Sequence, residues 1–368
     1  MTAAPRTPRA TPPSELLRRA RHSGGPVPSN GVNPVSIAVH GALVYVANAG
    51  TSTSSGATNY TGFTLNPGGH LRPLPGSTVT LPDGSQPGDV LFSSDGSRLV
   101  GTRVATSLID SFAVDGDGLL TAAAGSPFAA QGLGPFGSEF RPTNPAQLYV
   151  ANAHDGTNAG TVSAFTVSAD GTLTPIAGSP FPDNQTAPCW VEISHDGRYL
   201  FTVNTGSKSI SSYSIAAAGS LSLLQSTPLN APAASPQDAR LSPDGSTPWV
   251  ADLGPDGRLG PARHVAGGPQ ESVVEPEWNP QGILHFVSDR SGWWNLYRER
   301  HGQVEPLLPM AAEFADAPWG FDYSSYAFVT DGHIACRYRQ HGRDRLTLLD
   351  PETGRLTDLP TPYTRSTR

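Results

Sequence analysis

The chain has 368 residues, of which 40 are glycine, 36 are proline and only 15% are charged. This abundance of glycine and proline is typical of a protein built from short strands and turns. A formal net charge of −7 argues against a nucleic-acid partner, because phosphate binding needs clustered positive side chains. No apolar run approaches the ~18 residues needed to span a bilayer, so we expect no membrane partner.

The first thirty residues differ from the rest of the chain. They are rich in proline, arginine and threonine, and the basic segment Ser14–Arg21 is too short to be a stable helix in water. We therefore predict a disordered tail over residues 1–30. Residues 1–13 have no apolar core of the kind that a secretory signal needs, so we expect a cytoplasmic protein.

Four later segments share one pattern: polar and apolar residues alternate, the chain turns at glycine, and a leucine follows. They are Thr61–Leu71, Ser111–Leu120, Ser163–Leu173 and Ser211–Leu221. Alternation with period two predicts β-strands, and glycine supplies the positive φ that a tight turn requires. Each segment is therefore predicted to be a β-hairpin.

Two more strands are predicted upstream of each hairpin. The nearer strands are rich in β-forming residues and span Leu43–Ala47, Arg98–Thr102, Leu148–Ala151 and Tyr199–Val203. The farther strands open with proline, at Pro34, Pro87, Pro135, Pro188 and Pro236, which by subtraction lie 53, 48, 53 and 48 residues apart. Four strands in about fifty residues, repeated in tandem, predict an all-β propeller. Over residues 31–364 we expect one domain of about seven blades, mostly of four antiparallel strands.

The pattern changes near residue 254. Strands opened by proline continue at Pro276 and Pro318, but at shorter intervals, and charged residues become more frequent. Where the pattern changes, residues 236–268 are predicted to form only three strands: Gln237–Leu241, Pro248–Leu253 and Arg258–Ala266. We interpret this as a junction inside one blade, between blades of different origin over 31–253 and 254–364.

The first part resembles the lactonase-family propellers. Its marks are Leu43–Asn48 and Leu148–Asn152, which share Tyr-Val-Ala-Asn, together with Ala177–Phe181 and Ser242–Gly245. On these motifs, residues 30–253 are similar to bacterial 6-phosphogluconolactonase and to proteins with Tyr-Val-Thr-Asn repeats. The resemblance implies a propeller fold and, as an expectation, hydrolysis of a sugar lactone.

The second part looks like the propeller of prolyl-oligopeptidase-family serine peptidases. The residues that carry this resemblance are Trp249–Leu253, Asp256–Leu259, Arg263–Gly268, Pro276–Trp278, Phe286–Arg290, Gly292–Arg298 and Asp350–Arg355. That family performs its chemistry on a separate domain, with a serine in a Gly-x-Ser-x-Gly turn. No such pentapeptide occurs in this sequence, so peptidase activity is not expected.

The resemblance to lactonases also implies histidine directly after the proline that opens an inner strand, where it would act as a general base. In this chain the corresponding residues are Val35, Gly88, Phe136, Cys189 and Gln237. None is a histidine, so the family's catalytic residues cannot be carried over. The resemblance therefore implies a fold more than a reaction, and whether the chain is an enzyme stays open.

Charged residues at equivalent positions suggest another kind of site. Glu139, Glu192 and Arg240 each lie four residues after an opening proline, while Asp89 and Asp238 lie two after it. Equal spacing predicts equal heights on successive inner strands, which line the channel of a propeller. These groups would bind a small polar ligand, or they form a solvated wall whose charges balance.

Other candidate groups have ordinary interpretations beside the functional one. His154 and His195 each precede Asp-Gly, where a catalytic histidine and a simple turn are both compatible with the pattern. Cys189 and Cys336 lie too far apart in sequence to indicate a disulfide framework or a zinc site, and we expect two buried, inert thiols. No cofactor and no metal are predicted.

Three functions are compatible with these patterns. The first is a binding or scaffold propeller that takes a small polar molecule or a protein partner at the channel mouth. The second is a lactone hydrolase with substituted residues, and the third is a fused propeller without selected activity. The missing histidines after the opening prolines favour the first over the second.

Overall fold

The computed structural model describes residues 27–51, 56–66, 70–229, 256–261, 263–268, 270–315, 325–329 and 332–359. Every helix or strand assigned in these ranges is a β-strand, and none of the described residues forms a helix long and apolar enough to cross a membrane. The chain divides into two compact units, and among the described residues the boundary between them in sequence lies between Ser226 and Thr227. We call them unit 1 and unit 2 and describe each by itself.

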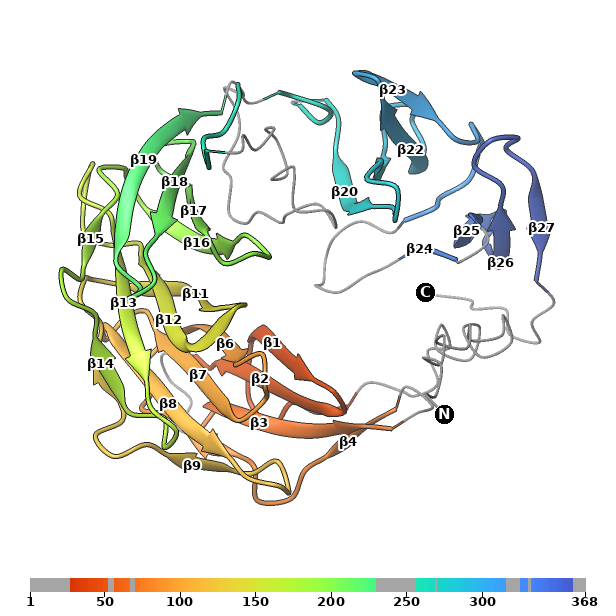
Figure 1. Cartoon of the computed structure of the whole chain (residues 1–368). Coiled ribbons are helices and arrows are strands. Elements are labelled where there is room, and N and C mark those ends of the chain that lie inside the picture. The colour runs from red at the N-terminus through yellow and green to blue at the C-terminus, as the bar shows by residue number, and fades with distance from the viewer. Residues whose placement is uncertain are drawn as a thin grey trace, which may run out of the picture. The chain divides into compact units, whose positions relative to one another are not determined.

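Unit 1 contains four antiparallel sheets in chain order (Figure 1). The first sheet comprises β1 (Pro34–His40), β2 (Leu43–Ala49), β3 (Thr58–Leu65), β4 (Leu71–Pro73) and β5 (Val79–Thr80). The second comprises β6 (Pro87–Phe92), β7 (Arg98–Arg103), β8 (Leu108–Val114), β9 (Leu120–Ala122) and β10 (Phe128–Ala129). The third comprises β11 (Pro135–Arg141), β12 (Asn144–Asn152), β13 (Thr161–Val167), β14 (Leu173–Pro175) and β15 (Phe181–Pro182). The fourth comprises β16 (Pro188–Ile193), β17 (Tyr199–Asn204), β18 (Ser209–Ile215) and β19 (Leu221–Pro228).

Unit 2 contains two four-stranded antiparallel sheets. The first comprises β20 (Val273–Trp278), β21 (Leu284–Ser288), β22 (Asn295–Arg300) and β23 (Gln303–Pro306). The second comprises β24 (Tyr326–Phe328), β25 (Ile334–Gln340), β26 (Arg343–Leu349) and β27 (Leu356–Asp358). The all-β propeller class is confirmed, but the described ranges hold six sheets where we expected seven blades.

The predicted strands are confirmed throughout unit 1. The inner strands begin at Pro34, Pro87, Pro135 and Pro188, and the next strand in each sheet covers the predicted β-rich segment. Proline suits the first position of a strand because it has no N–H to donate to a ladder.

Unit 2 departs from the prediction in two places. Pro276 does not open its strand, since β20 begins three residues earlier and is bulged between Val274 and Glu277. The strand expected at Arg258–Ala266 is wrong as well, because the described residues of that segment form no strand. Pro236, Pro318 and the other strands predicted for the junction blade lie outside the described residues.

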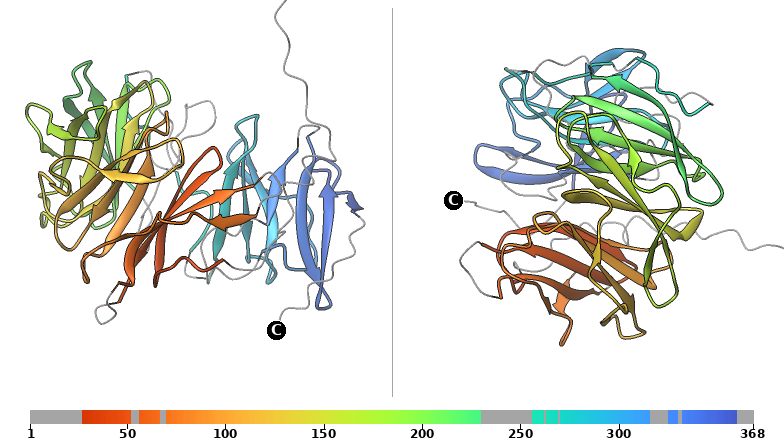
Figure 2. Two further views of the ribbon diagram at one scale, coloured as in Figure 1. Left: turned by 90° about the horizontal axis from the view of Figure 1, so that it is seen from below. Right: turned by 90° about the vertical axis from the view of Figure 1, so that its left-hand side faces the viewer.

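Successive sheets of unit 1 lie face to face, as Figures 1 and 2 show, and apolar side chains fill the space between them. The core between the first and second sheets includes Tyr45, Tyr60 and Phe112, and that between the third and fourth includes Tyr149 and Tyr213. A sheet that lies between two others thereby has both faces removed from water. Each Å² of apolar surface buried in this way stabilises the fold by ~25 cal/mol. This repeated burial explains why the sequence pattern recurs in each of the four sheets of unit 1.

Candidate ligand-binding site on the inner strands of unit 1

The inner strands β1, β6, β11 and β16 lie side by side in that order, and each is bulged directly after its opening proline. Each proline faces the last residue, or nearly the last, of the second strand, in the pairs Pro34–Asn48, Pro87–Arg103, Pro135–Asn152 and Pro188–Asn204. A bulge re-aims the side chain that it carries and is frequent beside functional sites. The bulges therefore define a set of equivalent positions at one end of the four strands.

Buried amides hold this end of the first, third and fourth sheets, and in the first sheet Asn48 Nδ2 donates to Asn59 Oδ1 at 2.9 Å. Asn152 Nδ2 donates to the hydroxyls of Thr161 and Ser163 on the third strand, both at 2.9 Å. Asn204 Nδ2 donates likewise to Ser209 at 3.1 Å and Ser211 at 2.9 Å. The asparagine of the Tyr-Val-Ala-Asn motif is thus a structural residue that joins the second strand to the third.

The second sheet replaces this amide with an ion pair. Arg103 donates through Nε and a terminal nitrogen to the two oxygens of Asp110, at 2.7 and 2.5 Å. Tyr60, from the first sheet, donates its hydroxyl to the same carboxylate at 3.1 Å. Both charged side chains are buried, so the pair is removed from solvent, and each charge is compensated by the other. Sequence reasoning missed it because the two residues belong to different strands and differ in type from the asparagine and serine that the third and fourth sheets have at the same positions.

The residues that the bulges carry are mostly apolar. Val35 is 38% exposed, Phe136 and Cys189 are half-buried, and Gly88 is buried. A Cβ on Gly88 would lie 2.7 Å from Cγ2 of Val104, which explains the glycine. The Phe136 ring meets that of Trp190 edge-on, with centroids 6.0 Å apart. Val35, Phe136 and Cys189 therefore present mostly apolar surface, and none of the four positions has an imidazole.

Asp89, one of the predicted ligand residues, is buried among three inner strands. Its Oδ2 accepts from the backbone N–H of Ser138 at 3.0 Å and from the Ser138 hydroxyl at 2.7 Å, while its Oδ1 accepts from the Ser36 hydroxyl at 3.0 Å. Burial raises the pKa of this carboxyl, and the hydrogen bonds from the serines oppose that shift. The carboxylate joins β1, β6 and β11, so its oxygens are engaged within the protein.

Glu139 and Glu192 occupy equivalent places on β11 and β16. Each is half-buried, and they face Tyr149 and Phe201 at corresponding points of the second strands. Arg141, two residues after Glu139, donates to the Gly197 carbonyl of the fourth sheet at 2.7 Å. Ser138, directly before Glu139, points toward Asp89 of the second sheet, so alternation places Glu139 on the opposite face of β11, toward the fourth sheet.

His154 lies at the same end of the third sheet but is exposed. Its ring covers Gly134, where an added Cβ would come within 2.5 Å of the imidazole Cγ. The following residue, Asp155, accepts from the Leu133 N–H at 2.6 Å, so turn chemistry holds this loop. The remaining two predicted ligands, Arg240 and Asp238, lie outside the described residues.

The family model described as a lactonase, a seven-bladed β-propeller, matches residues 140–258. The periplasmic gluconolactonase of Pseudomonas aeruginosa is 18% identical, with a TM-score of 0.52, over 86% of this chain and 94% of that one. A Bacteroides uniformis protein assigned as a 6-phosphogluconolactonase is also 18% identical, with a TM-score of 0.54 and the same coverage.

The chain is a β-propeller, and it is similar to lactonases over residues 140–258. At these identities the likeness to solved structures shows the fold alone. No curated protein matches the sequence significantly. A puromycin hydrolase structure matches with a TM-score of 0.47, which is too low to support an argument. The likeness of 254–364 to peptidase propellers therefore stays a prediction.

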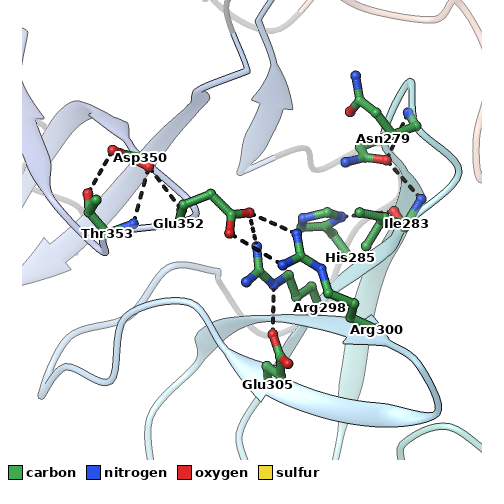
Figure 3. A network of polar contacts seen from close by, with 10 residues as sticks. Asn279, Ile283, His285, Arg298, Arg300, Glu305, Asp350, Glu352 and Thr353 are labelled. Atoms are coloured by element: carbon green, nitrogen blue, oxygen red, sulfur yellow. Dashed lines mark hydrogen bonds and ion pairs between the residues drawn. The ribbon is translucent and has the colours of Figure 1, made fainter.

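Unit 2 contains a polar network that sequence reasoning also missed (Figure 3). Glu352, in the turn after β26, pairs with Arg298 at 2.6 Å and Arg300 at 2.8 Å, and Arg298 also pairs with Glu305 at 2.9 Å. Hydrogen bonds from Arg300 and Arg298 lower the pKa of Glu352 to about 2. The network joins the two sheets of unit 2 through charges that satisfy one another.

His285 lies beside this network and is buried. Its Nδ1 donates to the Ile283 carbonyl at 2.9 Å, and its ring packs against Phe328. Burial lowers the pKa of His285 to about 4, so the imidazole is neutral near pH 7. A buried neutral imidazole with an engaged nitrogen is a core residue of unit 2.

The cysteines only partly match their prediction. Cys336 is buried, and burial raises the pKa of its thiol to about 12, so it is an inert thiol as expected. Cys189 is half-buried on β16, because the bulge after Pro188 turns it away from the core. Among the described residues, no cluster of three histidine, cysteine, aspartate or glutamate side chains is arranged to hold a metal ion.

Proposed function

We propose that this lactonase-like propeller is a binding protein, which takes a small polyhydroxylated ring compound at the bulged end of its inner strands and does not hydrolyse it. One observation carries the proposal: the residues that follow the opening prolines are Val35, Gly88, Phe136 and Cys189. The resemblance to lactonases implies a histidine there as the general base, and none of these four residues is a histidine.

The chemistry that remains suits binding. The edge-on pair of Phe136 and Trp190 offers an apolar surface to the C–H face of a ring. The half-buried Glu192 offers a carboxylate group to its hydroxyls, whereas Oε2 of Glu139 is buried away from solvent. A mostly apolar surface with a few polar groups that converge on it is typical of small-molecule sites.

The test combines binding and hydrolysis. D-Gluconate and D-glucono-δ-lactone are titrated into the full chain by calorimetry, and lactone opening is followed by pH-stat at pH 7. We expect saturable binding of at least one probe and no opening above the spontaneous rate. Trp190→Ala should weaken binding about tenfold, the equivalent of ~1.4 kcal/mol for the lost aromatic contact. Trp293→Ala, an exposed tryptophan of unit 2, is the matched control and should change nothing.

Two results would contradict the proposal. Catalysed opening that Glu139→Gln or Glu192→Gln abolishes would favour the alternative, a lactone hydrolase with substituted residues. Absence of binding for both probes would refute a polyhydroxylated ligand and favour a fused propeller without selected activity.

A further inference from the structure

An aspartate occupies a core position between the third and fourth sheets of unit 1. Asp183 directly follows the short strand β15, and its N–H donates to the Gly160 carbonyl at 2.8 Å. The same backbone bond is made after β5 by Leu81, to Thr58 at 2.9 Å, and after β10 by Ala130, to Ser107 at 3.0 Å. Two repeats thus place an apolar side chain where the third places a carboxyl group.

The surroundings of Asp183 do not compensate a negative charge. The side chain is fully buried, Thr202 donates to its Oδ2 at a long 3.2 Å, and Oδ1 has no hydrogen-bond partner. The hydroxyls of Ser211 and Tyr213 on β18 are the other groups close enough to affect its pKa. Among the described residues of β17 and β18 that face it, the Tyr213 phenol is the one titratable group, and none is cationic.

Burial outweighs these weak hydrogen bonds and raises the pKa of Asp183 to about 6. An unfolded aspartate has a pKa near 3.9. Between these values the folded protein binds the proton more readily than the unfolded chain, so stability is greatest below pH ~4 and falls as the pH rises through 6. The group therefore acts against the fold at neutral pH.

We propose that Asp183 makes the contact between the third and fourth sheets of unit 1 proton-dependent. In the protonated form the side chain packs as a neutral group beside Phe181 and Tyr213, as Leu81 packs in the first repeat. Ionisation leaves an uncompensated charge in that core and weakens the contact. The contact between these two sheets is therefore more stable in mildly acidic surroundings than at neutral pH.

The test is hydrogen exchange of the full chain at pH 5.0 and 7.5, corrected for the intrinsic effect of pH on exchange. With pKa values of about 6 and 3.9, the opening constant of β17 and β18 should be about tenfold larger at pH 7.5 than at pH 5.0. Asp183→Asn, which cannot ionise, should remove this difference. Asp183→Leu, which restores the residue of the first repeat, should do the same. Asp95→Asn is the control, since that carboxyl is about half exposed and should leave the difference intact.

The proposal is overturned if β17 and β18 open equally at both pH values, or if the Asn and Leu variants keep the tenfold difference. Should neither variant fold, the carboxyl carbon of Asp183 is titrated by ¹³C NMR in the unaltered chain. A midpoint near pH 6 supports the proposal, and one near pH 4 refutes it.

Discussion

The buried pair of Arg103 and Asp110 offers the sharpest test of how the repeats of unit 1 are built. At the equivalent places the third and fourth sheets use an asparagine with a serine: Asn152 with Ser163, and Asn204 with Ser211. We therefore consider Arg103→Asn, Asp110→Ser and the double variant, which installs in the second sheet the amide and hydroxyl of its neighbours.

Each single substitution leaves one charge buried without its partner. Removing one member of a buried ion pair costs about 3–5 kcal/mol of unfolding free energy. Arg103→Asn should fall at the lower end of that range, because Tyr60 still donates to the Asp110 carboxylate. The double variant removes both charges and leaves only unfilled volume, for which we expect about 1–2 kcal/mol. The sum of the single costs should therefore exceed the cost of the double variant by at least 4 kcal/mol.

Urea unfolding of the full chain gives these free energies, and hydrogen exchange of β7 and β8 assigns the loss to the second sheet. A double variant as unstable as the sum of the singles would refute the argument, because it would mean that the pair does more than compensate its own charges. Single variants that lose less than about 1 kcal/mol would also refute it, since they would show that water reaches the pair.

Four further predictions follow from the contacts described above. Asp89→Ala should cost about 1–3 kcal/mol in urea unfolding because it leaves the Ser138 N–H unpaired; a loss no larger than that of the exposed Asp117→Ala would count against this. For His285, with its pKa lowered to about 4, the stability of unit 2 should rise between pH 4 and 6.5, the opposite sign to Asp183. Hydrogen exchange of β21 at pH 4 and pH 6.5 would measure that rise, and His285→Gln should abolish it. Glu352→Ala should change the unfolding free energy by at most about 1 kcal/mol, since its side chain is 60% exposed, and a larger loss would show that the network is cooperative. A fluorophosphonate probe should not label the chain, and stoichiometric labelling of a serine would show that a nucleophile exists without the Gly-x-Ser-x-Gly turn.

The strands of unit 1 were predictable because each follows from a local rule. Alternation, a turn glycine and an opening proline all act within a few residues, so Pro34, Pro87, Pro135 and Pro188 mark their strands in the sequence itself. The same rule failed at Pro276, which lies in a bulge inside β20 and therefore needs no free strand end. Proline is tolerated at both kinds of position, and only the neighbouring strand decides between them.

The positions of the candidate site residues along their strands could be predicted from the sequence, but the groups that surround them could not. Spacing after the proline placed Glu139 and Glu192 at equivalent positions, because both strands have the same one-residue bulge after the proline. Spacing says nothing about the residue that lies across from a side chain on the next sheet. Asp89 lies against Ser138 of β11, 49 residues later, which only the packed structure brings close.

The sequence by itself determined that the chain is a repeated all-β protein, that its repeats resemble the lactonase propellers, and that the histidine expected after each opening proline is missing. Those properties depend on residue identity and on neighbours along the chain. The tertiary structure alone decided which polar groups are removed from water. The buried state of Asp183, the pairing of Arg103 with Asp110 and the neutral His285 each depend on contacts between strands or sheets. A pKa or an ion pair is set by the groups within a few ångströms, and in stacked sheets most of those groups come from distant parts of the chain.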